Sequence, residues 1–216
     1  MFLIKMIYIS GILNKIQLLS LIIIFFIDCP DLSSQVKSGY RWGINMTTMS
    51  INYQGKNIKA ETPFGVQFGG NFEITLSRNY AFLSGFIFSS KGTDYAINNA
   101  DFSIAPAYLE IPGNLAYKFG RRSTRLSLFA GPYFAAAFGG YKSDDGYKIL
   151  TLGSRESKDL KVIDFGFNAG IALSINSHVF TVQYGTGLRD VSPKNDMEMI
   201  NKVIGISLST LWSIKK

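Results

Sequence analysis

The sequence is poor in the residues that most soluble enzymes use for chemistry. Among 216 residues there is one cysteine, Cys29, and one histidine, His178, and charged residues make up only 17%. A single cysteine excludes an intramolecular disulfide framework and a cysteine-rich zinc site. Soluble domains contain about 25% charged residues, so this shortage indicates a chain whose surface largely avoids water.

The residues that are abundant indicate a membrane class. Hydrophobic residues make up 47% of the chain, aromatic residues make up 14%, and there are 21 glycines. The net charge of +7 is dispersed along the chain, with no basic helix. This pattern argues against a nucleic-acid partner and favours an anionic lipid surface.

The first 34 residues have the features of a cleaved secretory signal peptide. Lys5 and Lys15 precede the apolar run 18–27, which is shorter than the ~20 residues needed to span a bilayer as a helix. We expect cleavage near Ser34, which removes Cys29 and leaves one domain at residues 35–216. An uncleaved anchor is the alternative.

Beyond residue 35 the chain shows the period of two that is typical of β-strands. Between Phe64 and Leu76, and again between Ile163 and Ile175, large apolar residues alternate with small or polar ones. Weaker alternation predicts six more strands, around 40–46, 82–88, 109–119, 126–138, 180–188 and 204–212. Pro106, Pro112 and Pro132 fall inside these segments, where we expect bulges or strand ends because proline cannot donate a ladder hydrogen bond.

The connections between the predicted strands alternate in length. Short turns are predicted at 77–79, 120–123 and 176–177, and longer polar segments at 50–61, 91–101, 141–161 and 190–199. Outer-membrane barrels have short periplasmic turns and long extracellular loops. The pattern therefore predicts an all-β, eight-stranded antiparallel up-and-down transmembrane barrel with both ends of the chain in the periplasm.

Alternation alone fits a soluble lipocalin-like barrel equally well, with its apolar face inside. The small or polar face decides between them, because it is rich in Gly, Ala, Ser and Asn rather than in the Thr, Lys and Glu typical of a water-facing strand. Small residues suit the crowded axis of a narrow barrel. We therefore expect the apolar face to meet lipid, including Phe64, Phe68, Phe72, Phe165, Phe167 and Ile171.

Several segments resemble the small PorT-like outer-membrane beta-barrel domains of Gram-negative bacteria. The most specific is YLEIPGNLAYKF at 108–119, and the others are SGFIFSSKG at 84–92, AGPYF at 130–134, DFGFNAGIAL at 164–173 and QYGTGLRDV at 183–191. The resemblance implies an eight-stranded barrel in the outer membrane and, for some members, a part in protein secretion or gliding. It implies no catalytic residue. The chain departs from the usual aromatic end of such barrels, since four residues follow Trp212.

Charged and polar residues on the predicted inner face form a candidate lumen network. An unpaired charge in a narrow lumen is costly, so we expect a salt-bridged plug rather than a channel or an acid–base pair. The predicted members are Arg41, Glu73, Glu110, Lys118, Arg125, Asp164, Gln183 and Arg189.

The longest predicted loop, 141–161, is the candidate site for a partner. Its aromatic and basic residues suit a protein surface or lipopolysaccharide phosphates, and they are Tyr141, Lys142, Tyr147, Lys148, Arg155 and Lys158. A mobile connecting loop is the alternative. Asp144, Asp145, Glu156 and Asp159 are interrupted by basic residues, so no metal site is predicted.

Three function classes remain open. The first is a non-enzymatic outer-membrane protein with a structural or interaction role, with outer-membrane lipid and lipopolysaccharide around it and possible accessory work in protein secretion. The second is an outer-membrane enzyme that modifies lipid or cleaves protein, against which the position of His178 beside a periplasmic turn argues. The third is a soluble barrel that binds an apolar ligand. No cofactor motif is present.

Overall fold

The computed structural model describes residues 36–97, 100–121, 123–143 and 146–213; the predicted signal peptide, residues 1–34, lies outside them. Most of the described chain is in β-strands, and it contains no helix that is long and apolar enough to cross a bilayer. The strands are β1 (Val36–Tyr53), β2 (Lys56–Ile58), β3 (Ala60–Glu61), β4 (Phe64–Thr75), β5 (Tyr80–Ser90), β6 (Thr93–Ile97), β7 (Ala100–Arg121), β8 (Thr124–Ser143), β9 (Tyr147–Ile149), β10 (Ile163–Ile175), β11 (His178–Gly187) and β12 (Met197–Ser213).

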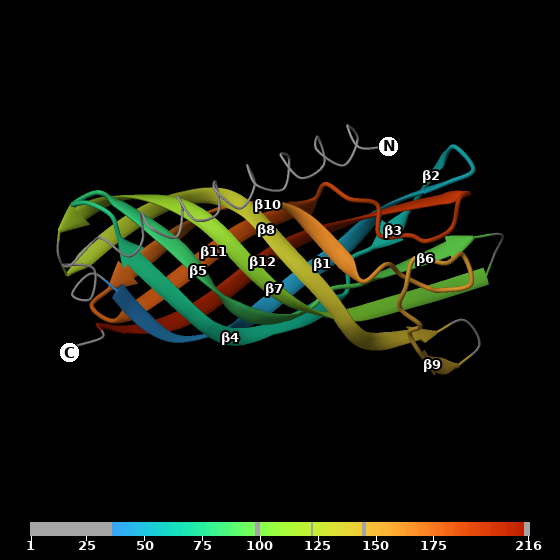
Figure 1. The fold of residues 1–216 in the computed structure, drawn as a ribbon, viewed down its shortest axis with the longest axis horizontal. Helices are drawn as coiled ribbons and strands as arrows, with labels where there is room; N and C mark the ends of the chain where they lie inside the picture. Colours follow the sequence, from blue (N-terminus) through green and yellow to red (C-terminus); the bar gives the residue numbers. More distant parts are fainter. Residues whose placement is uncertain (1–35, 98–99, 122, 144–145, 214–216) are drawn as a thin grey trace, which may run out of the picture.

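Eight of these strands form a closed ring (Figure 1). Neighbours pair in the order β7, β5, β4, β1, β12, β11, β10 and β8, and pairing of β8 with β7 closes the circle. Every pairing in the ring is antiparallel. The predicted eight-stranded antiparallel barrel is confirmed, and closure leaves the ring without an unpaired edge.

The two ends of the barrel differ as the connections predict. Residues 76–79, 122–123 and 176–177 connect successive ring strands at one end, where β1 begins and β12 ends. At the other end, β2, β3, β6 and β9 extend the sheet beyond the ring (Figure 1). We call these the inner and the outer end. Much of what the sequence indicated as outer loop is therefore strand.

The polarity of the two strand faces inverts toward the outer end. On β1, the outward residues Tyr40, Trp42 and Ile44 are apolar and exposed, whereas beyond Met46 it is the buried, inward residues Met49 and Ile51 that are apolar. β12 shows the same inversion, with buried Met197 and Met199 before exposed Ile204 and Ile206. From the inner end up to about Met46 on β1, the barrel wall therefore has an apolar outward face. At the outer end its interior is apolar instead.

The three prolines lie within strands rather than at strand ends. The β7–β8 register shifts between Ala107 and Tyr108, next to Pro106. Pairing of β7 with β8 is also interrupted between Pro112 and Leu115, opposite Pro132. The β5–β7 ladder is also interrupted at Pro112, between the pairs Ser84–Gly113 and Ile87–Glu110, so pairing is weakened on both sides of β7.

Candidate functional site

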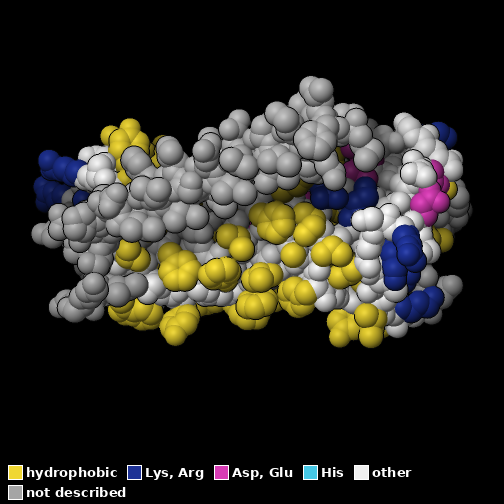
Figure 2. Space-filling model, viewed as in Figure 1, with side chains coloured by type: hydrophobic (Ala, Val, Ile, Leu, Met, Phe, Trp, Pro, Cys, Tyr) yellow, Lys and Arg dark blue, Asp and Glu magenta, His cyan; other side chains and the backbone are white. Residues whose placement is uncertain are grey.

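Exposed apolar side chains on all eight ring strands form a belt between the inner end and the outer extension of the sheet. Figure 2 shows the part of this belt on the visible face of the barrel. The residues expected to meet lipid, including Phe64, Phe68 and Phe167, are exposed on the belt. Neighbouring rings stack across the strands, with the ring centroids of Phe68 and Phe88 5.2 Å apart. Near the inner end Tyr40 meets Trp212, and Tyr80 meets Tyr117, both edge to face. Aromatic girdles of this kind are typical of membrane interfaces.

Glycines on the inner face make room for large side chains in the lumen. A Cβ atom at Gly166 would lie 2.6 Å from Cε1 of Tyr133, and one at Gly170 would lie 2.6 Å from Cζ of Phe129. Both distances are well inside van der Waals contact. The crowding that the glycine-rich face predicts is therefore present, and it lets Tyr133 and Phe129 fill the interior.

A buried ionic cluster occupies the outer half of the lumen. Lys91 Nζ lies 2.8 Å from Oε2 of Glu110 and 3.7 Å from Oδ2 of Asp164. The same ammonium lies 4.4 Å and 5.1 Å from the ring centroids of Tyr133 and Tyr108. The side chains of Lys91 and Asp164 are 3% and 0% exposed, so desolvated cation and carboxylate depend on each other here.

Hydrogen bonds complete this cluster. The Tyr133 hydroxyl and the Asn201 amide both donate to Oδ2 of Asp164, at 3.1 and 2.9 Å. Asn201 also donates to the Tyr108 hydroxyl. Residues from β7, β8, β10 and β12 and the segment after β5 are thereby joined across the barrel axis, which is how a buried polar network rigidifies a core.

A second group of charges lies in the inner half of the lumen. Glu73 accepts from Lys118 at 2.5 Å and lies 3.5 Å from Lys37. Arg41 donates from Nη2 to the amide oxygen of Gln183 at 2.8 Å. Arg125 donates to the backbone carbonyl of Arg78 at the inner mouth. This half therefore contains more cations than carboxylates.

The structure brings most of the predicted lumen residues inside the barrel but divides them between the two groups. Arg189 is the exception, because it lies beyond the outer end of β11, which stops at Gly187. Sequence reasoning missed Lys91, which it assigned to an outer polar segment. The signal was available, since the inward positions Ile87 and Ser89 lead directly to Lys91 in the period of two.

The lumen is filled between these groups. Two cavities in its middle, one beside Arg41 and Lys118 and one beside Lys91 and Gln183, measure about 60 and 10 Å³. A single water needs about 10–15 Å³, so these spaces hold a few waters and form no pore.

A filled lumen predicts an absence of ion conduction. Purified protein inserted into planar bilayers should show no stable, large conductance, because the ionic cluster around Lys91 obstructs the axis. Voltage-clamp recording at both polarities measures this. A steady current of pore size that scales with the amount of inserted protein would contradict the plug.

The outer end of the barrel is closed by a small hydrophobic core of its own, which we call the outer cap. Its buried members are Met49, Ile51, Ile104, Leu150, Leu160, Val191, Met197 and Met199. Leu150 and Leu160 come from the segment that the sequence indicated as the longest loop. The part of that segment that contains Leu150 and Leu160 is therefore packed against the outer end of the barrel.

Ionic contacts also hold the segment 150–161 in place. Lys142 bonds to Asp159, and Lys161 bonds to Asp190 at 2.8 Å. Asp159 also accepts from the backbone nitrogen and the hydroxyl of Thr151. Burial opposes ionisation of Asp159, but the hydrogen bonds from Lys142 and Thr151 outweigh it and lower the pKa of the carboxyl group.

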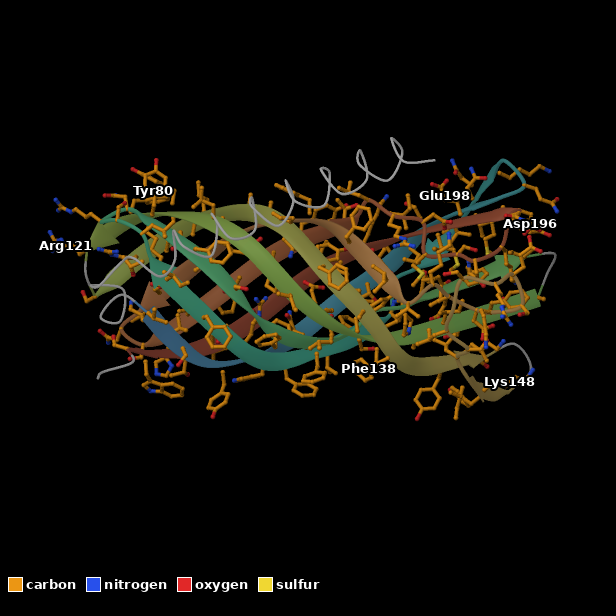
Figure 3. The ribbon with its side chains drawn as sticks, viewed as in Figure 1. Tyr80, Arg121, Phe138, Lys148, Asp196 and Glu198 are labelled. Atoms are coloured by element: carbon orange, nitrogen blue, oxygen red, sulfur yellow. The ribbon has the colours of Figure 1, made fainter. Side chains whose placement is uncertain are left out.

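The β8–β9 hairpin carries the other predicted partner-binding residues. Tyr141 pairs with Ile149, Ser143 pairs with Tyr147, and Lys142 pairs with Lys148 on the opposite face. Tyr147 is 89% exposed and Ile149 75% exposed. Figure 3 places Lys148 at the outer end, beyond Phe138 on the lipid-facing wall. Arg155 is exposed and Lys158 half-buried in the folded segment, while Asp144 and Asp145 lie outside the described residues.

Gly140 lies where β8 continues from the barrel wall into the hairpin. Gly140 has a φ of +142°, a conformation that side chains other than glycine rarely adopt. A Cβ atom there would also lie 2.4 Å from the Ala105 carbonyl oxygen. In Figure 1, β8 curves away from the barrel axis at this point and places β9 at the outside of the molecule.

His178 lies at the inner end, at the start of β11. Its side chain is exposed, and its Nδ1 lies 3.3 Å from the hydroxyl of Thr210. In the part of the chain that the structure describes, no group of three or more His, Cys, Asp or Glu side chains is placed to hold a metal ion.

Comparison with known proteins places this architecture in a family. Residues 31–192 match the outer membrane protein beta-barrel domain. No curated protein matches the chain. Among solved structures, the chain is similar to Ail of Yersinia pestis, crystallised with the heparin analogue sucrose octasulfate, at 10% identity and a TM-score of 0.43 over 82% of this chain and 99% of that one.

Two other solved barrels are similar at comparable sequence identity. Neisserial surface protein A matches at 10% identity with a TM-score of 0.41 over 81% of this chain and 97% of that one. The N-terminal barrel domain of OprF from Pseudomonas aeruginosa matches at 11% identity with a TM-score of 0.28 over 76% and 96%. Since the family match extends over three quarters of the sequence, the chain belongs to the outer membrane protein beta-barrel domain family and is a protein of the Gram-negative outer membrane.

Proposed function

We propose that this outer-membrane barrel is non-enzymatic and presents its outer hairpin β8–β9 to a protein partner. The observation that carries the proposal is a rigid support beneath an exposed apolar surface. The outer cap and the Lys142–Asp159 ion pair fix the base of the hairpin, while Tyr147 and Ile149 project from it. Exposed aromatic and aliphatic side chains on a fixed scaffold are typical of contact surfaces.

The charges of the hairpin favour a protein over lipopolysaccharide phosphates. Two of the loop lysines are already engaged by carboxylates, Lys142 by Asp159 and Lys161 by Asp190. Tyr141, Tyr147 and Ile149 share one face of the hairpin. An apolar face with few uncommitted cations suits the core of a protein interface better than a phosphate cluster.

The interior and the inner end support the non-enzymatic part of the proposal. The buried charges of the lumen are committed to one another around Lys91, Glu110 and Asp164. His178 is exposed beside Thr210 at the inner rim. A nucleophilic mechanism requires a base in contact with its nucleophile in a site that excludes water, and neither arrangement offers this.

Replacing Tyr147 and Ile149 together by serine tests the proposal. We expect the variant to fold with unchanged heat-modifiability, because both side chains project into solvent, and to lose a co-purifying outer-membrane protein by about tenfold or more. The measurement is affinity purification after cross-linking on intact cells, together with complementation of a deletion strain. Lys56→Ser, at the tip of the β1–β2 hairpin, is the matched control on the same end.

Two results would count against the protein partner. Unchanged co-purification and complementation would remove the hairpin as a contact surface. Loss of bound lipopolysaccharide with the co-purified proteins unchanged would assign the hairpin to lipid instead. A component of a secretion machine among the lost proteins would identify the accessory secretion role that the PorT-like resemblance implies.

A further inference from the structure

The inner end of the barrel opens into a vestibule lined by basic side chains. It is a cavity of about 670 Å³, and its polar lining includes Lys37, Glu73, Lys118, Ser123, Arg125 and Asn176. Above it, the 60 Å³ cavity continues to Arg41, and both cavities are lined by Glu73 and Lys118. The vestibule therefore leads from the periplasmic rim toward the middle of the lumen.

The charges along this path are not balanced. In the part of the chain that the structure describes, the path is lined by four cations, Lys37, Arg41, Lys118 and Arg125, and by one carboxylate, Glu73. Glu73 is shared between Lys37 and Lys118. The two arginines bond to uncharged acceptors, Arg41 to the Gln183 amide and Arg125 to the Arg78 carbonyl. Among the described residues the path thus has a net charge of about +3, of which Lys37 is 42% exposed at the rim whereas Lys118 is buried. Uncompensated charge is costly at the buried positions.

Arg41 supplies a second, independent observation. Its Nε atom is buried and has no hydrogen-bond partner in the described structure. In the outer half of the lumen the buried cation Lys91 is paired with two carboxylates, Glu110 and Asp164. Arg41 has no carboxylate partner within salt-bridge distance among the described residues. The side-chain oxygens of Asn71 and Asn114, which line the same cavity, are buried without a donor as well. Unpaired buried groups of both kinds are explained by bound water or by an ion that enters the cavity.

We infer that the vestibule binds a phosphate group. Ammonium groups at Lys37 and Lys118, the guanidinium of Arg125 and hydroxyls such as Ser123 supply the charge-assisted donors that phosphate oxygens accept. The vestibule also opens at the membrane rim beside Trp212. Either free phosphate from the periplasm or the headgroup of an inner-leaflet phospholipid has this chemistry. The site is separate from the outer hairpin and does not depend on the role proposed for it.

Phosphate titration of the purified full barrel tests the site. Inorganic phosphate at low ionic strength should bind saturably, as followed by calorimetry, and should shift the amide resonances of Asn176 and Ser177. Lys37→Gln with Arg125→Gln should weaken binding by about tenfold or more, since two charge-assisted contacts are lost. Lys37 is 42% exposed and Glu73 keeps its closer partner Lys118 when Lys37 is replaced, so the variant should still fold.

Arg121→Gln is the matched control, because Arg121 is exposed on the rim at the same end (Figure 3) and does not line the vestibule. It removes the same charge and should change binding less than about twofold. Equal weakening in the control and the double variant would show diffuse attraction and overturn the site. Absence of saturable binding would overturn it as well.

Native mass spectrometry with phosphatidylglycerol separates the two sources of phosphate. Retention of the lipid by the wild type and its loss in the double variant would identify the headgroup. Binding of inorganic phosphate without lipid retention would identify the free anion. Lipid and phosphate binding that both persist in the double variant would contradict the assignment of these residues.

Discussion

Replacement of Lys91 by methionine is expected to lower the free energy of unfolding by about 3 to 5 kcal/mol. The substitution keeps most of the side-chain volume but removes the charge that lies 2.8 Å from Glu110 and 3.7 Å from Asp164. Both carboxylates are then buried without their cation. Removing one partner of a buried ion pair costs more than the pair contributes, because the remaining charge stays desolvated.

Urea unfolding in lipid vesicles, followed by tryptophan fluorescence, measures this loss. Lys56→Met is the matched control, because Lys56 is exposed at the tip of the β1–β2 hairpin, and it should change stability by less than about 0.5 kcal/mol. The double variant Lys91→Met with Glu110→Gln should recover part of the loss, since one unpaired carboxylate is removed. A Lys91→Met barrel as stable as the control would show that the cluster is not a coupled unit.

The wall of the barrel could be predicted from the sequence because it repeats one simple rule. The segment Ile163–Ile175 was identified with both of its bounds, and Phe64–Leu76 extends one residue beyond β4. In these segments large apolar residues face lipid, and small or polar residues face the barrel axis. The two environments therefore produce a regular alternation of residue types. A period of two is easily detected when both faces obey it.

The outer end could not be predicted in the same way because its environments are exchanged. Above the apolar belt the outward face meets water, and the interior becomes apolar around Met49, Leu160 and Met199. The alternation continues through this region with inverted polarity, which makes the strands look like polar loops. Beyond Met46 on β1, the apolar residues change from the outward to the inward positions. We interpret this change as the height along the barrel at which the lipid ends.

The pairing of lumen residues was beyond the reach of the sequence for another reason. An inward position can be assigned from the period of two, but its partner depends on which strands meet across the axis and at what height. Lys91 contacts Glu110 on β7 and Asp164 on β10. No short sequence spacing connects these three residues. The sequence could predict that the lumen charges pair with one another and fill the barrel. The structure was needed to show that they divide into an outer cluster and a basic inner vestibule.

A second large effect is expected for Phe68→Arg, which should destabilise the barrel in lipid by about 2 to 4 kcal/mol. Phe68 lies in the middle of β4, is 56% exposed on the apolar belt and stacks on Phe88. Each neighbouring strand also presents an apolar side chain there, Trp42 on β1 and Phe88 on β5. An arginine in this position must leave its charge in hydrocarbon or bend toward an interface, and both are costly.

Two further variants separate the cost of the charge from other effects. Phe68→Leu loses the stacked ring but stays apolar, so it should cost about 1 kcal/mol. Tyr147→Arg introduces the same charge on the outer hairpin, where the side chain is 89% exposed, and should cost about 0 to 1 kcal/mol because a charge beyond the hydrocarbon remains hydrated. The expected loss of refolding free energy therefore decreases in the order Phe68→Arg, Phe68→Leu, Tyr147→Arg. The first two differ in charge at one depth, and the two arginine variants differ in depth in the bilayer. Equal stability of Phe68→Arg and Tyr147→Arg would mean that the apolar belt does not face lipid.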